Sequence, residues 1–116
     1  MKLLNRQQFL AQPSGIVFAK DDADIDTFQI KGNTIDENDF NYQPLVSINS
    51  DTFEEHHDAV IHLRSVLEAE ADFYNWYRDG SYDEKETFVV LEKHEVRGLI
   101  ERLEQTLVEG YADIIP

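Results

Sequence analysis

The sequence predicts an α+β fold, in which an antiparallel sheet of about five strands is packed by two main helices and a short N-terminal helix. Two long segments place apolar residues at helical spacing, and five short runs are rich in β-branched and aromatic residues. These runs do not alternate regularly with the helical segments, which disfavours a parallel α/β sheet. We expect the 116 residues to form one domain, residues 1–116, whose sheet is either open or curled into a small barrel-like shape.

The N-terminal part of the chain predicts the short helix and three strands. A helix over residues 3–11 would place Leu3, Leu4 and Leu10 on one side. Gly32 is expected to end the second strand. The predicted strands cover residues 16–19, 28–31 and 42–48. Acidic loops are predicted at residues 21–24 and 36–41.

The first long helix is predicted over residues 52–71. Asp51 is placed to cap its N-terminus, with Glu54 completing a reciprocal capping arrangement. The apolar positions that recur at helical spacing are Phe53, Val60, Leu63 and Leu67. We expect this side of the helix to lie on the sheet.

The C-terminal part predicts two strands and the second long helix. The aromatic run at residues 73–77 and the apolar run at 88–91 are expected to pair across a long connection. The helix is predicted over residues 94–109, and Gly110 is placed to end it. Its apolar stripe consists of Val96, Leu99, Ile100, Leu103 and Leu107. This stripe is expected to cover the same face of the sheet as the first long helix.

The composition excludes several classes of function. The chain has no cysteine, which removes disulfides, thiol catalysis and cysteine-ligated zinc. It has 24 Asp and Glu against 10 Lys and Arg, a formal net charge of −14, so we expect no direct binding to nucleic acid or to an anionic membrane. No apolar run has the length of a signal-peptide core or a membrane span, which predicts a cytoplasmic protein.

The negative charge is concentrated in the middle of the chain. Residues 21–84 contain seventeen acids and three bases, which equals the whole net charge of −14. Excess charge of one sign keeps a small protein soluble, and it also speeds association with an oppositely charged partner. From the second effect we predict a surface that binds a basic protein, such as a nucleic-acid-binding protein. The predicted surface residues are Asp21, Asp22, Asp24, Asp26, Asp36, Glu37, Asp39, Asp79, Asp83 and Glu84.

Aromatic residues form a second candidate site. In a strand over residues 73–77, successive rings would point to opposite faces, so that both faces would carry large side chains. Either the domain covers both sets, or Tyr74, Trp76 and Tyr82 form an exposed patch for a partner. Such a patch also fits a self-assembling accessory or virion component, which is the alternative to a binding protein, with a homo-oligomer as its assembled form.

Catalytic motifs are absent from the sequence, and we predict that the protein is not an enzyme and needs no metal or cofactor. The densest cluster of histidines and acids lies at residues 54–62, where a helix would bring His57, Asp58 and His62 near one another. Its spacing fits neither the His-Glu-x-x-His zinc motif nor a complete di-iron set. A solvated acidic helix face explains the cluster, and a metal-dependent enzyme is the remaining alternative.

Six short sequences are spread over most of the chain: Leu4-Asn5-Arg6, Phe9-Leu10, Pro13-x-Gly15-x-Val17-Phe18-Ala19-Lys20, Ile30-Lys31-Gly32, Asp39-Phe40-x-Tyr42 and Asp79-Gly80-x-Tyr82-Asp83-Glu84. In these residues the chain resembles small, uncharacterised acidic proteins encoded by phages and prophages. The resemblance implies no catalytic activity. It implies a phage accessory context, in which acidic inhibitors of host defence or of host DNA-binding proteins are a recurring theme.

Overall fold

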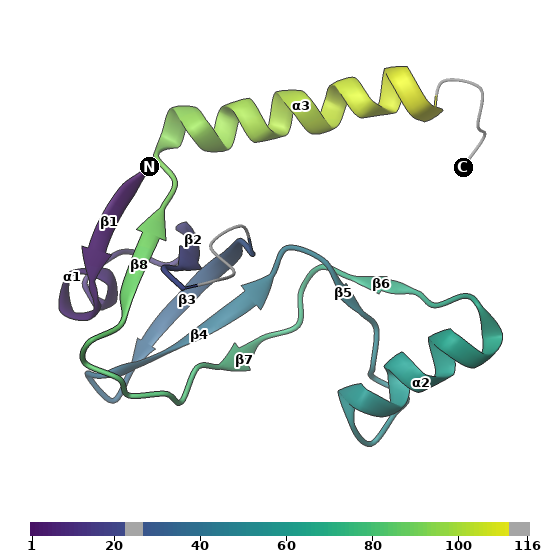
Figure 1. The fold of residues 1–116 in the computed structure, drawn as a ribbon, viewed down its shortest axis with the longest axis horizontal. Coiled ribbons are helices and arrows are strands. Elements are labelled where there is room, and N and C mark those ends of the chain that lie inside the picture. The colour runs from purple at the N-terminus through teal and green to yellow at the C-terminus, as the bar shows by residue number, and fades with distance from the viewer. Residues whose placement is uncertain (23–26, 112–116) are drawn as a thin grey trace.

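A six-stranded antiparallel sheet organises the molecule in the computed structural model, which describes residues 1–22 and 27–111 (Figure 1). The elements are β1 (Lys2–Asn5), α1 (Arg6–Leu10), β2 (Val17–Lys20), β3 (Gln29–Ile35), β4 (Asp39–Pro44), β5 (Ser47–Ile48), α2 (His56–Val66), β6 (Ala71–Asp72), β7 (Tyr77–Arg78), β8 (Thr87–Val90) and α3 (Lys93–Tyr111). The sheet has the order β1-β8-β2-β3-β4-β7, and β5 pairs separately with β6. The α+β class and the antiparallel sheet are confirmed, and the sheet is open rather than a closed barrel.

Phenylalanine rings from four different elements form the core. Phe9 of α1, Phe18 of β2, Phe40 of β4 and Phe88 of β8 are fully buried in one cluster. The Phe9 ring stacks on Phe88 with centroids 4.1 Å apart and lies 4.7 Å from Phe18. Offset and edge-on ring pairs add stability beyond the apolar area that they bury. A helix of five residues therefore closes the core.

The N-terminal segment is a strand followed by a helix, so the helix predicted over residues 3–11 is wrong in its first half. Leu3 and Leu4 pair with residues of β8 in the sheet. Asn5 then caps α1: its side chain accepts from the Gln8 N–H at 2.8 Å, and its own N–H donates to the Gln8 side chain at 3.0 Å. This reciprocal cap stops the helix from extending back into β1.

Strand pairing in the rest of the sheet differs from the prediction in two places. Gly32 does not end β3, which continues to Ile35 with an irregularity between Lys31 and Thr34. The run at 73–77 does not pair with β8. Instead β7 lies at the edge of the sheet beside β4, while β8 lies between β1 and β2. Residues 79–86 therefore cross from one edge of the sheet to its interior.

The two long helices do not cover the sheet, which corrects the predicted packing. α2 projects from the sheet on the small β5–β6 ribbon, and Ala59 is its one buried residue (Figure 1). α3 extends away from β8, and none of its residues is buried. Their ends also differ from the prediction: Glu55 precedes α2 without a side-chain cap, and α3 runs through Gly110. The apolar stripes of both helices thus lack the partner that the sequence led us to expect.

Candidate functional site

A buried arginine organises the end of the sheet where residues 79–86 cross. The Arg6 guanidinium donates to the Glu86 carboxylate at 3.1 Å, to the Asn38 carbonyl at 2.7 Å and to the Asp79 carboxylate at 3.5 Å. Its side chain is almost fully buried, so each of these hydrogen bonds replaces lost hydration. Arg6 thereby fastens the crossing segment to α1 and to the β3–β4 turn.

Lys20 reinforces the same two carboxylates from β2. Its ammonium lies 2.7 Å from Asp79 and 2.9 Å from Glu86. Burial alone would lower the pKa of Lys20, but its hydrogen bonds to these carboxylates outweigh that effect and raise it. Burial would likewise raise the pKa of Asp79, and the bonds from Lys20 and Ser81 lower it instead. The ionised forms of both groups are therefore favoured.

Asp39 joins β7 and the crossing segment to β4. It is fully buried, and it accepts hydrogen bonds from Arg78 Nε and, at 2.9 Å, from the Gly80 N–H. Burial would raise the pKa of Asp39, but these hydrogen bonds lower it. Arg78 also donates to the Tyr82 hydroxyl at 2.7 Å and lies 3.5 Å from Asp36. Tyr82 is thus held in place through Arg78.

Two of the predicted surface acids are internal, and we correct that interpretation here. The Asp39 and Asp79 side chains are 0% and 3% exposed, because both pair with the buried Arg6 of this network. The remaining described acids of the prediction are exposed: Asp21, Asp22, Asp36, Glu37, Asp83 and Glu84. Asp24 and Asp26 lie outside the described residues.

Some of these exposed acids line two openings. The first is a cavity of about 480 Å³ lined on one side by Glu37 and Asn38 of the β3–β4 turn and on the other by Tyr82 and Glu84. Arg6, Gln7 and Leu10 of α1 and the preceding Asn5 complete the lining. This cavity brings together residues more than 40 positions apart in the sequence. We call its lining residues Glu37, Tyr82 and Glu84, with the adjacent Asp36, the acidic rim.

The second opening lies on the other side of the network. It is a smaller cavity of about 250 Å³, lined by Lys20, Asp22, Thr27, Gln29, Tyr42 and Asp79. The neighbouring Asp21 is held by the Thr87 hydroxyl, which donates to its carboxylate at 3.0 Å. Because Arg6 pairs with Asp79, the buried ion pairs separate the two openings. The predicted acidic surface therefore consists of two groups of acids, and the same buried ion pairs lie beneath both.

The three aromatic residues predicted to form a patch are exposed, but their surroundings differ. Tyr74 is 80% exposed, and it lies with Trp76 on the irregular segment between β6 and β7. Trp76 packs against the backbone at Gly32, where a Cβ would come within 2.6 Å of the indole ring. Tyr82 belongs to the acidic rim through its bond to Arg78. The alternating strand faces predicted for residues 73–77 do not form, because residues 73–76 are not a strand.

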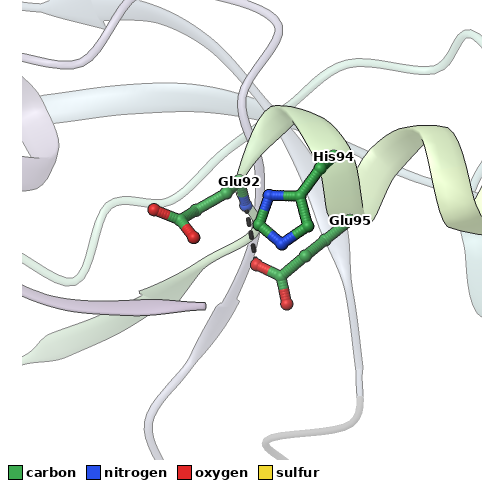
Figure 2. A group of neighbouring side chains, drawn as sticks. All are labelled: Glu92, His94 and Glu95. Carbon is green, nitrogen blue, oxygen red and sulfur yellow. Dashed lines mark hydrogen bonds between the residues drawn. The ribbon is translucent and has the colours of Figure 1, made fainter.

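One group of side chains could hold a metal ion in the described part of the chain, and it is not the histidine and acid cluster at residues 54–62. Ligand atoms of Glu92, His94 and Glu95 lie within 4.8 Å of one another (Figure 2). Glu95, however, already accepts from the Glu92 N–H at 3.0 Å and pairs with the Met1 ammonium at 2.6 Å. These bonds, the one from the ammonium foremost, lower the pKa of Glu95. The group therefore serves to cap α3 and attach it to β1.

The histidine-rich segment lies on the exposed side of α2. His56, His57 and His62 are all exposed, and the His62 ring contacts Phe53 at a centroid distance of 5.2 Å. Exposed polar side chains of this kind are expected on a helix that projects from the fold.

No local pattern in the sequence identifies Arg6, Lys20 and Glu86 as site residues. Their partners lie up to 80 positions away, so neither spacing nor periodicity identifies them.

Comparison of the chain with protein-family models, with curated proteins and with solved structures found no match. Among the described residues, no helix is both long enough and apolar enough to span a membrane.

Proposed function

We propose that this chain is a non-enzymatic binding protein that presents the acidic rim to a basic protein partner. Two openings carry exposed acids, and the rim has the larger of these two cavities, where Tyr82 lies beside Glu37 and Glu84. The proposed setting is a phage accessory protein or inhibitor acting in the cytoplasm of the cell that makes it. Nucleic-acid-binding proteins are the proposed class of partner, because their binding surfaces are rich in Lys and Arg.

The observation that carries this proposal is that, in the part of the chain that the structure describes, the charged side chains of the buried network are paired, whereas the glutamates of the rim are not. Three cations, Arg6, Lys20 and Arg78, lie beside carboxylates of the buried network. Glu37 and Glu84, by contrast, are exposed and form no ion pair within the described residues. The buried network is therefore close to neutral, while the rim keeps an uncompensated negative charge available to a partner.

The chemistry of the rim suits the side chains of a basic protein. Carboxylates of Glu37 and Glu84 can accept from a guanidinium or ammonium group, and a Tyr82 ring can lie against the same cation. Because Arg78 already holds the Tyr82 hydroxyl, binding costs little ordering of this ring. We expect fast association that slows as salt screens the charges.

A charge-reversal pair tests the proposal. The variant Glu37→Lys/Glu84→Lys and its control Glu54→Lys/Glu55→Lys change the net charge equally, but the control acts near α2. We expect proteins captured from a host lysate by the wild type and the control at about 50 mM salt to be lost with the rim variant, and released at about 500 mM salt. Equal capture by the rim variant, or capture that resists salt, would contradict the proposal.

The inhibitory role has its own measurement. If the captured partner binds DNA or RNA, adding the wild-type chain should displace the nucleic acid in a gel-shift competition, and the rim variant should displace it at least about tenfold less well. Displacement by both variants alike would place the binding surface elsewhere.

A further inference from the structure

The longest helix of the molecule exposes the C-terminal part of its apolar stripe, and the Val96 and Leu99 side chains are half-buried. α3 has 19 residues, and none is buried. Leu103 and Leu107 on the stripe are 57% and 62% exposed, and Ile100 is more than half exposed beside them. A contiguous apolar face of this kind is typical of an interaction surface in a protein that is otherwise highly charged.

The base of α3 is fixed in a way that keeps the stripe off the sheet. The connection from β8 is two residues long, and the Leu91 N–H donates to the Val17 carbonyl at 2.9 Å. Glu95 in the first turn pairs with the Met1 ammonium, while Lys2 lies 3.5 Å from Glu92. The helix therefore leaves the sheet in a set direction, as Figure 1 shows. The stripe is available to a partner from another molecule.

The charge of α3 selects the partner. Residues 1–92 contain nineteen acids and seven bases, a net charge of −12, whereas α3 contains four acids and three bases, a net charge of −1. A strongly basic or acidic partner helix would find little complementary charge there. Two copies of α3 meet with almost no net repulsion, so a second copy of this chain fits the stripe.

The order of the charges within α3 selects an antiparallel pair. Residues 93–102 contain three bases and two acids, whereas residues 103–111 contain two acids and no base. Parallel helices would place acidic half against acidic half. Antiparallel helices place the basic half of each copy against the acidic half of the other, which is the favourable arrangement.

A specific register satisfies both the stripe and the charges. If Ile100 lies opposite Leu103 of the partner subunit, then Val96 lies opposite Leu107 of the partner subunit. At a rise of about 1.5 Å per residue, Arg97 then lies within about 3 Å, along the axis, of Glu104 of the partner subunit. Helical spacing places Arg97 and Glu104 on the same flank of the stripe. Neither has an ion-pair partner elsewhere in the described chain.

We propose that this chain forms a two-fold symmetric dimer through antiparallel pairing of its α3 helices. The Val96, Leu99, Ile100, Leu103 and Leu107 side chains form the seam, and Arg97 and Glu104 form two equivalent ion pairs across it. The proposal is independent of the acidic rim, which lies on different elements.

Sedimentation of the full chain tests the dimer. We expect the wild type to change from monomer to dimer over a roughly hundredfold range of concentration, and Leu103→Glu to stay monomeric while keeping its circular dichroism. Arg97→Glu should weaken the dimer about tenfold, and Arg97→Glu/Glu104→Arg should restore it. Glu101→Arg is the matched control, because it lies away from the stripe and should leave the dimer intact. A strictly monomeric wild type, or a double variant that stays weak, would overturn the proposal.

Cross-linking tests the orientation without interference, because the chain has no cysteine of its own. Mixing Val96→Cys with Leu107→Cys should give the mixed disulfide dimer on mild oxidation, and each variant alone should give little. Cross-linking of each variant with itself would indicate a parallel pair and refute the antiparallel register. Both experiments use the chain alone, so a failure of the rim to bind its partner leaves their outcome unchanged.

Discussion

The shortest helix and the longest helix of this molecule differ in how many of their residues they bury. α1 has five residues and places Phe9 in the centre of the core, whereas α3 has 19 residues and buries none. The radius of gyration is 16.4 Å, against roughly 13 Å expected for a compact domain of this length. An amphipathic stripe therefore indicates that a surface needs a partner. It does not indicate that the partner lies in the same chain.

The largest expected effect contrasts the two helices directly. Phe9→Ala should lower the free energy of unfolding by about 4 kcal/mol, because it removes the ring that stacks on Phe88 and leaves a cavity. Leu107→Ala should change it by less than about 0.5 kcal/mol in dilute monomer, because that side chain is exposed. Urea unfolding of the two variants measures both values. Equal losses would mean that α3 contributes to the core.

The buried network gives the next effect. Arg6→Leu should cost about 3 kcal/mol, because the Asn38 carbonyl and the Asp79 and Glu86 carboxylates lose a buried donor. Arg64→Leu on the exposed side of α2 is the control, and we expect almost no change there. A loss of similar size in both variants, measured by the same unfolding experiment, would show that burial does not distinguish the two regions.

Acid should weaken the network by a smaller amount, since Arg6 remains charged. The folded state lowers the pKa of Asp39 and Asp79, so their contribution is present above their ordinary pKa of 3.8 and is lost as the pH falls through the lowered values. At the alkaline end, the raised pKa of Lys20 gives a contribution that is fully present below 10.5 and is lost as the pH rises through the raised value. Thermal unfolding against pH should show both slopes, and Asp39→Asn should flatten the acidic one.

The smallest effect concerns a cation that the network does not include. Lys31 is buried, donates to the Gly32 carbonyl and the Thr34 hydroxyl, and forms no ion pair among the residues described. Burial lowers its pKa, so the charged form weakens the fold and stability should rise as the pH rises through the lowered value. Lys31→Met should therefore stabilise the protein by about 1 kcal/mol, whereas Lys85→Met should not. A destabilised Lys31→Met would mean that its two hydrogen bonds outweigh the cost of burial.

The sequence predicted the helices and strands whose formation depends on residues close together in the chain. β2, β8 and the existence of α2 and α3 follow from runs and spacings within a few residues. The strand β1 was missed because Leu3 and Leu4 fit a helix equally well, and pairing with β8 decides between the two. No residue close to Gly32 in the sequence indicates that Trp76 packs against it.

The candidate site was predictable only in part, for the same reason. The exposure of Glu37, Tyr82 and Glu84 follows from their position in polar loops, but their convergence depends on ion pairs to Arg6 and Arg78. The prediction that Asp39 and Asp79 are surface charges is wrong because sequence composition does not distinguish a solvated acid from a buried one.

The pairing of β1 with β8 also sets the timing of folding during synthesis. Residues 2–5 pair with residues 87–90, so the first strand to leave the ribosome waits for one of the last. Until then the β2–β3–β4 meander carries Phe18 and Phe40 without the ring of Phe88 to complete the core. Closing so long a loop is slow. The nascent chain therefore passes through a stage in which a chaperone that binds exposed aromatic surface has a ready target.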